Sequence, residues 1–184
     1  MTTTLSAPQS ARAIGLCCWL EQQAFALLGA WTTELRQAGP KLVMLELSDH
    51  AAWRAQRWYE LLPTAPPGAD ALVLGTGELD ALIATAREID GADRALDRFT
   101  VAVSLLTLIE RSVSALADRT TAVSGAAVLR IAGIIRSDLL ADLDRCREVM
   151  SGLDAPPDSL LLARFDQDLR RFDTASPLEL LDRT

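Results

Sequence analysis

The predicted fold of this chain is organised around one segment, Lys41-Leu-Val-Met-Leu-Glu-Leu-Ser-Asp-His-Ala-Ala-Trp-Arg-Ala-Gln-Arg-Trp-Tyr-Glu60. It carries the only histidine of the protein, His50, with Glu46 one helical turn before it and Asp49 beside it. Imidazole and carboxylate groups are frequent metal ligands and proton carriers. If the protein has a chemical centre, we therefore expect this segment to contribute to it.

The composition favours a single helical domain. The chain has 184 residues, of which 49% are hydrophobic and only 5% are aromatic. A core built from such a chain consists mainly of Leu, Ala, Val and Ile, which suits close-packed helices. The net charge is −7, and Lys41 is the only lysine. Because a phosphate backbone requires clustered cations, we expect no nucleic-acid partner.

The cysteines and the terminal sequence indicate where the protein resides. Two of the three cysteines, Cys17 and Cys18, are adjacent, a spacing that fits neither a disulfide framework nor a zinc motif. We interpret all three as buried free thiols in a reducing compartment. No basic segment precedes an apolar one at the N-terminus, so no secretory signal is predicted. The longest uninterrupted apolar runs, 13–20 and 105–109, are too short to span a membrane. These features predict a cytoplasmic protein without a membrane partner.

Apolar residues recur every three to four positions through most of the chain, which predicts an all-α fold. We expect a loose N-terminus over 1–9, a helical domain over 10–151 and a C-terminal helix with a tail over 152–184. Within these limits, one helix is predicted to start at Ser10, and the others to cover about 41–62, 72–89, 92–118, the stretch from the turn at 120–125 to about 150, and 158–173.

A repeat with constant spacing relates the two halves of the chain. The motif Ser48-Asp49-x-x-Ala52 recurs as Ser137-Asp138-x-x-Ala141. Asp49 follows Glu21 by 28 residues, and Asp138 follows Glu110 by the same number. Both glutamates lie among apolar residues in the middle of predicted helices. Two helical hairpins joined by a long connection would bring the four carboxylates to the centre of a four-helix bundle.

With these residues the chain resembles the ferritin-like superfamily, including its tRNA-hydroxylase-like and other di-iron oxygenase branches. The resemblance covers about 10–150. It implies an antiparallel four-helix bundle with a long crossover between the second and third helices, followed here by a short C-terminal helix. In that family the first and third helices each supply a Glu, and the second and fourth each supply Glu-x-x-His. The resemblance implies that Glu21 and Glu110 match the single glutamates, and that Asp49 and Asp138 match the Glu of the two motifs.

The metal motif implied by the resemblance is degenerate. Its two histidine positions fall on Ala52 and Ala141, which cannot bind metal. A second register takes Glu46-x-x-Asp49 as the motif, and His50 then lies about 100° around the helix from the ligand position. With at most one histidine we expect no standard di-iron site and no cofactor, and the alternative is an atypical carboxylate site for iron or manganese. The candidate metal ligands are Glu21, Glu46, Asp49, His50, Glu110 and Asp138.

The first turn decides whether Glu21 and Asp49 lie at the same height. The midpoint of Glu110 and Asp138 falls within the predicted turn at 120–125, so the second pair is level. The midpoint of Glu21 and Asp49 is residue 35, which fits a turn near 33. A turn at Gly39-Pro40 is the other possibility, and it would offset the pair by about 12 Å at 1.5 Å per residue.

Arginines offer a simpler partner than a metal for the two glutamates. Those available are Arg36, Arg54, Arg57, Arg130, Arg136 and Arg145. In that arrangement His50 is expected to bond to Glu46 one turn earlier. We therefore expect a binding, scaffolding or non-catalytic partner protein, acting as a homodimer or with another protein. The alternatives are an oxidoreductase or hydroxylase-like protein with an atypical metal site, and a helical regulator with a small-ligand pocket at Trp53, Phe25 and Trp58.

Overall fold

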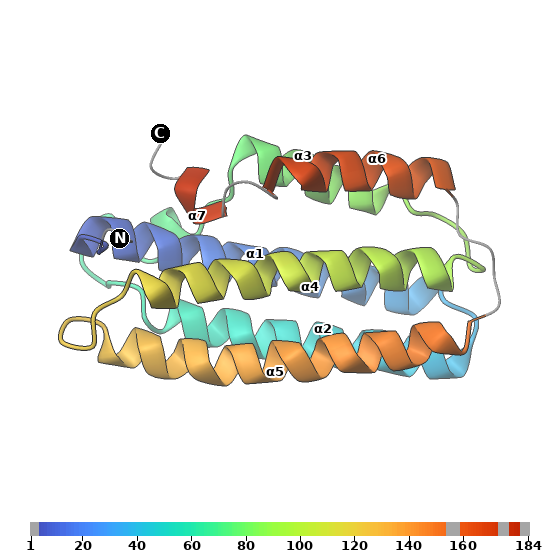
Figure 1. Ribbon diagram of the computed structural model, residues 1–184, viewed down its shortest axis with the longest axis horizontal. Coiled ribbons are helices and arrows are strands. Elements are labelled where there is room, and N and C mark those ends of the chain that lie inside the picture. Colours follow the sequence, from blue (N-terminus) through green and yellow to red (C-terminus); the bar gives the residue numbers. More distant parts are fainter. Residues whose placement is uncertain (1–3, 154–158, 173–176, 181–184) are drawn as a thin grey trace.

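A computed structural model of the protein describes residues 4–153, 159–172 and 177–180 (Figure 1). Every regular element in these ranges is a helix, which confirms the predicted all-α fold. The α-helices are α1 (Ala7–Glu34), α2 (Ala38–Tyr59), α3 (Gly77–Arg87), α4 (Ala95–Asp118), α5 (Ala126–Ser151), α6 (Ser159–Leu169) and α7 (Pro177–Leu180), and the 3-10 helices are η1 (Asp70–Leu72) and η2 (Arg170–Phe172).

Four long helices lie side by side in the described structure (Figure 1). α1 packs on α2 and on α4, and α5 packs on α4 and on α2. α1 and α5 run in one direction, whereas α2 and α4 run in the other. The connection from α2 to α4 passes through α3, which lies with α6 in a second layer on the α1 and α4 side. This arrangement brings side chains of α1, α2 and α5 together in the interior.

The first turn lies at residues 35–37, close to the earlier of the two predicted positions. Pro40 is inside the first turn of α2, where a proline is tolerated because the amide groups of a first turn have no partner within the helix. The short connection places the middle of α1 opposite the middle of α2. Glu21 is consequently within reach of the second half of α2.

The first helix begins earlier than the sequence indicated, and the predicted C-terminal helix is present. α1 begins at Ala7, inside the segment expected to be loose, and Gln9 Oε1 accepts a hydrogen bond from the Ser6 amide at 2.9 Å. The predicted helix at 158–173 corresponds to α6 and η2, and its Phe165 and Phe172 are buried. This segment therefore packs against the rest of the molecule. Residues 1–3, 154–158, 173–176 and 181–184 lie outside the described part of the chain.

The buried hydrophobic residues are mainly leucine, with alanine, isoleucine, valine and cysteine among them. All three cysteines are buried and free, as predicted. α1 and α4 are each long and apolar enough to cross a membrane, judged by length and composition alone. The prediction that no segment could span a membrane was based on uninterrupted apolar runs, and it missed the hydropathy of these whole helices. Of the most apolar window, 61% is buried in α1 and 56% in α4, and core helices of soluble proteins pass the same test. The apolar helices alone therefore do not establish a membrane location.

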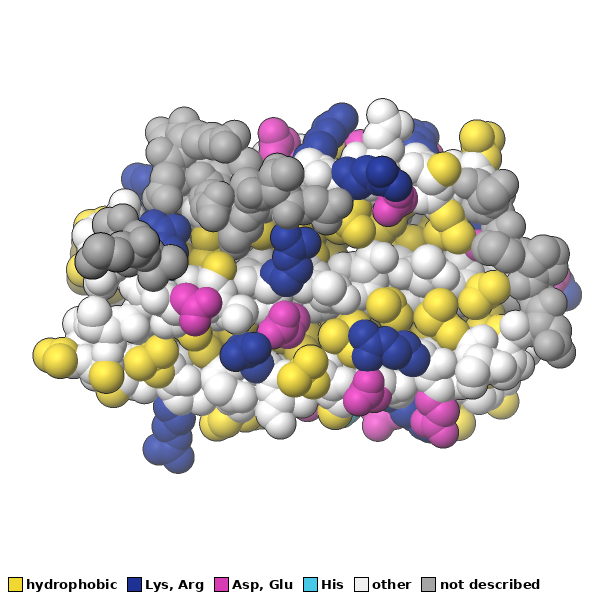
Figure 2. All heavy atoms as spheres, in the orientation of Figure 1, with side chains coloured by type: hydrophobic (Ala, Val, Ile, Leu, Met, Phe, Trp, Pro, Cys, Tyr) yellow, Lys and Arg dark blue, Asp and Glu magenta, His cyan; other side chains and the backbone are white. Residues whose placement is uncertain are grey.

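Charged groups of both signs alternate on the face shown in Figure 2, with apolar side chains between them. On the described residues of this face there is no continuous basic band.

Gly15 permits a close contact between α1 and η1. A Cβ atom at this position would lie 1.9 Å from the carbonyl oxygen of Leu72, which belongs to the backbone and cannot rotate away. We expect Gly15→Ala to destabilise the protein by about 1–3 kcal/mol or more, because the connection must move off α1. Chemical denaturation measures this change.

Gly133→Ala is the matched control for that substitution. Gly133 lies within α5, and a Cβ there would have no heavy atom within 4 Å. Alanine should therefore stabilise the helix by about 0.5–1 kcal/mol. Equal effects of the two substitutions would contradict the close packing of η1 on α1.

Candidate functional site

The guanidinium of Arg54 is the centre of a buried polar cluster. Arg54 is completely buried, and its Nε donates a hydrogen bond to Glu21 Oε1 at 2.9 Å. Its Nη1 donates to Asp138 Oδ2 at 2.7 Å and to Asp142 Oδ2 at 2.6 Å. One arginine on α2 thus joins a carboxylate of α1 to two carboxylates of α5.

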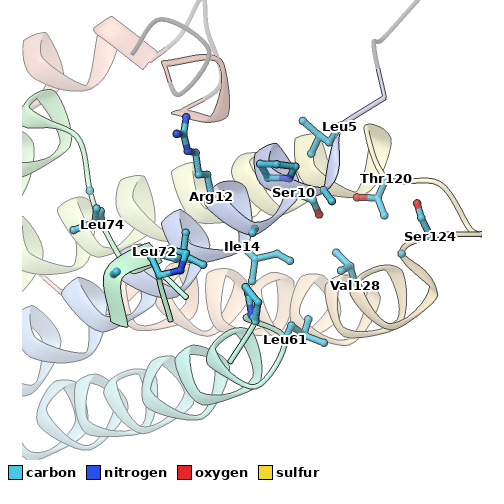
Figure 3. A pocket seen from close by; sticks show the side chains of 18 of the residues that line it. Leu5, Ser10, Arg12, Ile14, Leu61, Leu72, Leu74, Thr120, Ser124 and Val128 are labelled. Carbon is cyan, nitrogen blue, oxygen red and sulfur yellow. The ribbon is translucent and has the colours of Figure 1, made fainter. Parts of the chain in front are cut away.

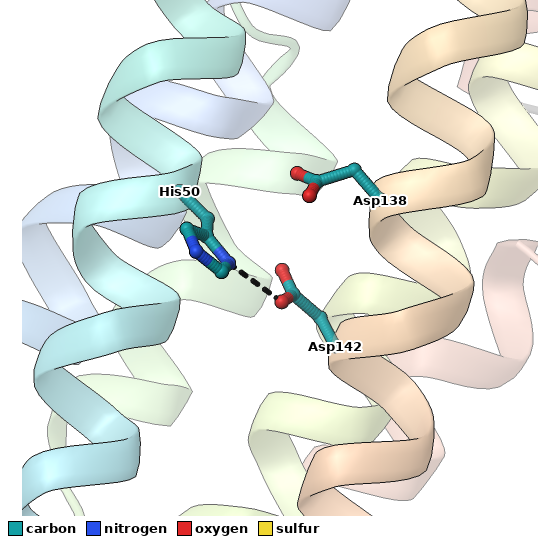
Figure 4. A group of neighbouring side chains, drawn as sticks. All are labelled: His50, Asp138 and Asp142. Atoms are coloured by element: carbon teal, nitrogen blue, oxygen red, sulfur yellow. Dashed lines mark hydrogen bonds and ion pairs between the residues drawn. The ribbon is translucent and has the colours of Figure 1, made fainter.

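Helical spacing explains why these groups meet. Asp138 and Asp142 are four residues apart on α5, so both side chains lie on the side that faces α2. His50 and Arg54 have the same spacing on α2 and face α5 in return. His50 Nδ1 lies 2.8 Å from Asp142 Oδ1, as Figure 4 shows. The His50 side chain is 37% exposed, so the cluster extends from the core to the surface.

Burial changes the protonation behaviour of the interior carboxylate. Desolvation raises the pKa of Glu21 to about 7, although Arg54 opposes this shift, and the charges of Asp142 and Asp138 raise the pKa further. Oε2 of Glu21 has no hydrogen-bond partner in the described structure. This oxygen can therefore carry a proton near neutral pH. Three carboxylates face one guanidinium, and protonation of Glu21 reduces the excess of negative charge.

The neighbouring carboxylates favour the charged forms of the two basic groups in the cluster. Burial disfavours the charged form of Arg54, but Glu21 and Asp142 outweigh it and raise the pKa of the guanidinium. Partial burial lowers the pKa of His50, whereas the hydrogen bond to Asp142 and the charges of Asp142 and Asp138 raise it by more, so the net shift is upward. Arg54 is consequently a permanent cation, and His50 titrates above its usual range.

Three of the six candidate metal ligands belong to this cluster and three do not. Glu21, His50 and Asp138 lie around Arg54. Glu46 and Asp49 are on the exposed side of α2. Asp49 precedes Arg54 by five residues, which is about 140° around a helix, so it points away from the interior. The repeat predicted that Asp49 faces the centre of the bundle, whereas in the structure His50 belongs to the central cluster and Asp49 does not.

Glu110 forms an ion pair with a different arginine, away from the Arg54 cluster. Arg136 Nε donates a hydrogen bond to Glu110 Oε1 at 2.9 Å, and the two side chains are 43% and 18% exposed. Both glutamates of the repeat thus bind an arginine of the following helix, as the simpler of the two interpretations predicted. His50, in contrast, bonds to Asp142 rather than to Glu46.

Sequence reasoning missed Asp142 and did not single out Arg54 from five other arginines. A signal for both was present. Asp142 follows the repeat residue Asp138 by four positions, and Arg54 follows His50 by four, so each pair shares one face of its helix. Complementary charges at this spacing on two helices indicate a polar contact between them.

The three aromatic residues of the predicted ligand pocket do not share a cavity. Trp58 is completely buried, whereas Phe25 and Trp53 are 48% and 45% exposed. Phe25 lines a depression of about 340 Å³ between α1 and α2, and neither Trp53 nor Trp58 lines it. Helical spacing directs these side chains to different sides, and a small-ligand pocket formed by all three stays a prediction.

Comparisons with protein-family models, with characterised proteins and with solved structures found no significant match to this chain. The geometry of the cluster and the arrangement of the helices are accordingly the grounds on which a function is proposed.

Proposed function

We propose that this protein is a ferritin-like four-helix bundle in which the Arg54 guanidinium occupies the place of a di-iron centre, and that it acts as a non-catalytic binding or scaffolding protein. The bundle consists of α1, α2, α4 and α5, with α3 in the long crossover. The observation that carries the proposal is the complete burial of Arg54 among the carboxylates of Glu21, Asp138 and Asp142. The opposite directions of α2 and α5, and of α1 and α4, support the bundle topology.

The residues present do not fit a di-iron centre. Such a centre requires four carboxylates and two histidines free to bind metal. Here Arg54 binds three carboxylates of the cluster, and Glu110 binds Arg136. The motif's two histidine positions hold Ala52 and Ala141. A guanidinium neutralises carboxylates but offers no open coordination position, so oxygen chemistry of the family type is not part of the proposal.

A scaffolding role suits both the interior and the surface. The Arg54 cluster connects three helices, and buried charged networks of this kind can fix one helix arrangement over others. Leu42, Leu45 and Trp53 are 64%, 52% and 45% exposed, and their spacing places them on one side of α2. Exposed apolar side chains on one side of a helix are suited to contact with a second protein. We propose a homodimer or a complex with another protein, in the cytoplasm.

Metal analysis tests this proposal. Protein purified without added metal, and then incubated with Fe²⁺ or Mn²⁺ and desalted, is expected to retain far less than one metal ion per chain. The reason is that the charged Arg54 must leave before two cations can enter. Elemental analysis by mass spectrometry gives the stoichiometry. About two iron ions per chain, lost in Glu110→Ala, would overturn the proposal.

A single-metal site is the second candidate function, and one observation favours it. Ligand atoms of His50, Asp138 and Asp142 lie within 4.8 Å of one another at the partly exposed edge of the cluster. Arg54 contacts the Oδ2 atoms of the two aspartates, so it does not engage their Oδ1 atoms. One metal ion per chain, lost in His50→Ala and retained in Glu110→Ala, would support this candidate over the first.

A further inference from the structure

A large cavity lies where α1, α3 and α5 begin (Figure 3). Its volume is about 1210 Å³, which exceeds the range of about 300–1,000 Å³ usual for small-ligand sites. The first turns of α1, the connection after α2, the start of α3 and the turn between α4 and α5 form its walls. The cavity is remote in sequence from the Arg54 cluster and shares no residue with it.

The walls of this cavity are mainly apolar. Ile14 and Val128 are almost fully buried at its inner side, whereas Leu74 is 62% exposed at the outside. Figure 3 shows these side chains around the first turns of α1, with hydroxyl groups of Thr120 and Ser124 at one edge. An apolar volume with polar groups at its edge suits the hydrocarbon part of a small molecule.

The charge of the cavity has the opposite sign to that of the protein. Although the chain contains 25 Asp and Glu residues, Arg12 is the only charged residue among the described residues that line the cavity. Arg12 is exposed and forms no ion pair with any residue that the structure describes. A ligand that combines a hydrocarbon with one negative charge would use both properties of the site.

The helix ends add to this preference. The amino-terminal ends of α1 and α5 reach the cavity, and such ends carry partial positive charge. α3 also begins there, but Glu78 and Asp80 in its first turn offset its positive end. The first turns of α1 and α5 contain no acidic residue, and Gly125 at the start of α5 provides no side-chain cap. The amides at the start of α5 can therefore interact with a ligand anion.

We propose that this cavity binds a small amphipathic carboxylate of the fatty-acid type. The hydrocarbon chain packs against Ile14, Leu61 and Val128, and the carboxylate lies at the rim within the positive field of Arg12 and the helix ends. The inference goes beyond the scaffolding function and does not depend on the Arg54 cluster. A small-ligand site was expected near Trp53, and this cavity lies at a different place.

Titration calorimetry with dodecanoate below its micelle concentration tests the proposal. One site per chain is expected. Arg12→Gln should weaken binding about two- to fivefold, the range for loss of one exposed charge contact. Leu74→Asp should weaken it similarly, because it places a negative charge in the lining at an exposed position where folding is not disturbed.

Arg130→Gln is the matched control. Arg130 is exposed on α5, does not line the cavity, and its replacement changes the net charge by the same amount as Arg12→Gln. Its affinity for dodecanoate should equal that of the unmodified protein. The proposal is overturned if no single-site binding occurs, or if Arg12→Gln and Leu74→Asp bind as tightly as Arg130→Gln.

Discussion

Arg54→Met is expected to destabilise the protein by about 3–5 kcal/mol, the cost usual for removing one partner of a buried ion pair. The side chain is fully buried and binds three carboxylates, so its loss leaves Glu21, Asp138 and Asp142 without their common cation. The methionine fills a similar volume, and the effect is therefore mainly electrostatic. Denaturant unfolding followed by circular dichroism measures the change.

Arg136→Met separates this effect from the general loss of an arginine. Among the described residues Arg136 binds only Glu110, and its side chain is 43% exposed, so its removal should cost less than about 1 kcal/mol. Arg54→Lys should fall between the two methionine variants, because lysine keeps the charge but not the planar array of donors. Equal losses for Arg54→Met and Arg136→Met would contradict the central role of Arg54.

Stability is expected to fall as the pH rises from about 5 to 8. The pKa of Glu21 is about 7 in the folded protein and 4.5 without the fold, so the folded state binds more protons in between. The stabilisation is complete below 4.5 and is lost as the pH rises through 7. At about 1.4 kcal/mol per unit of pKa, the loss is on the order of 3 kcal/mol. The raised pKa of His50 acts in the same direction, above 6.5.

Denaturation between pH 5 and 8.5 in the presence of a chelator measures this dependence. Glu21→Gln resembles the protonated carboxyl group and should remove the larger part of the slope. His50→Gln should remove only the part above 6.5. A stability that stays constant or rises over this range in the unmodified protein would contradict the assignment of the Glu21 proton.

The periodicity of apolar residues determined the helices of this protein, because burial of one helix face requires that spacing whatever the partner. The start of α6 was predicted to within one residue, since a pair of prolines precedes it in the sequence, whereas the helix predicted over 72–89 begins only at Gly77. The pairing of each repeat glutamate with an arginine was also foreseeable, because a buried carboxylate needs a cation.

The rotation of α2 was decided only by the tertiary structure. A difference of one residue turns a side chain by about 100°, and the sequence alone did not distinguish Asp49 from His50 as the inward position. Packing of α2 against α5 made that choice, since it placed His50 and Arg54 opposite Asp138 and Asp142. The same packing makes Arg54, rather than the lone histidine, the central residue of the segment 41–60. Arg54 and Asp138 are 84 residues apart in the sequence, and their contact depends on the position and rotation of both helices.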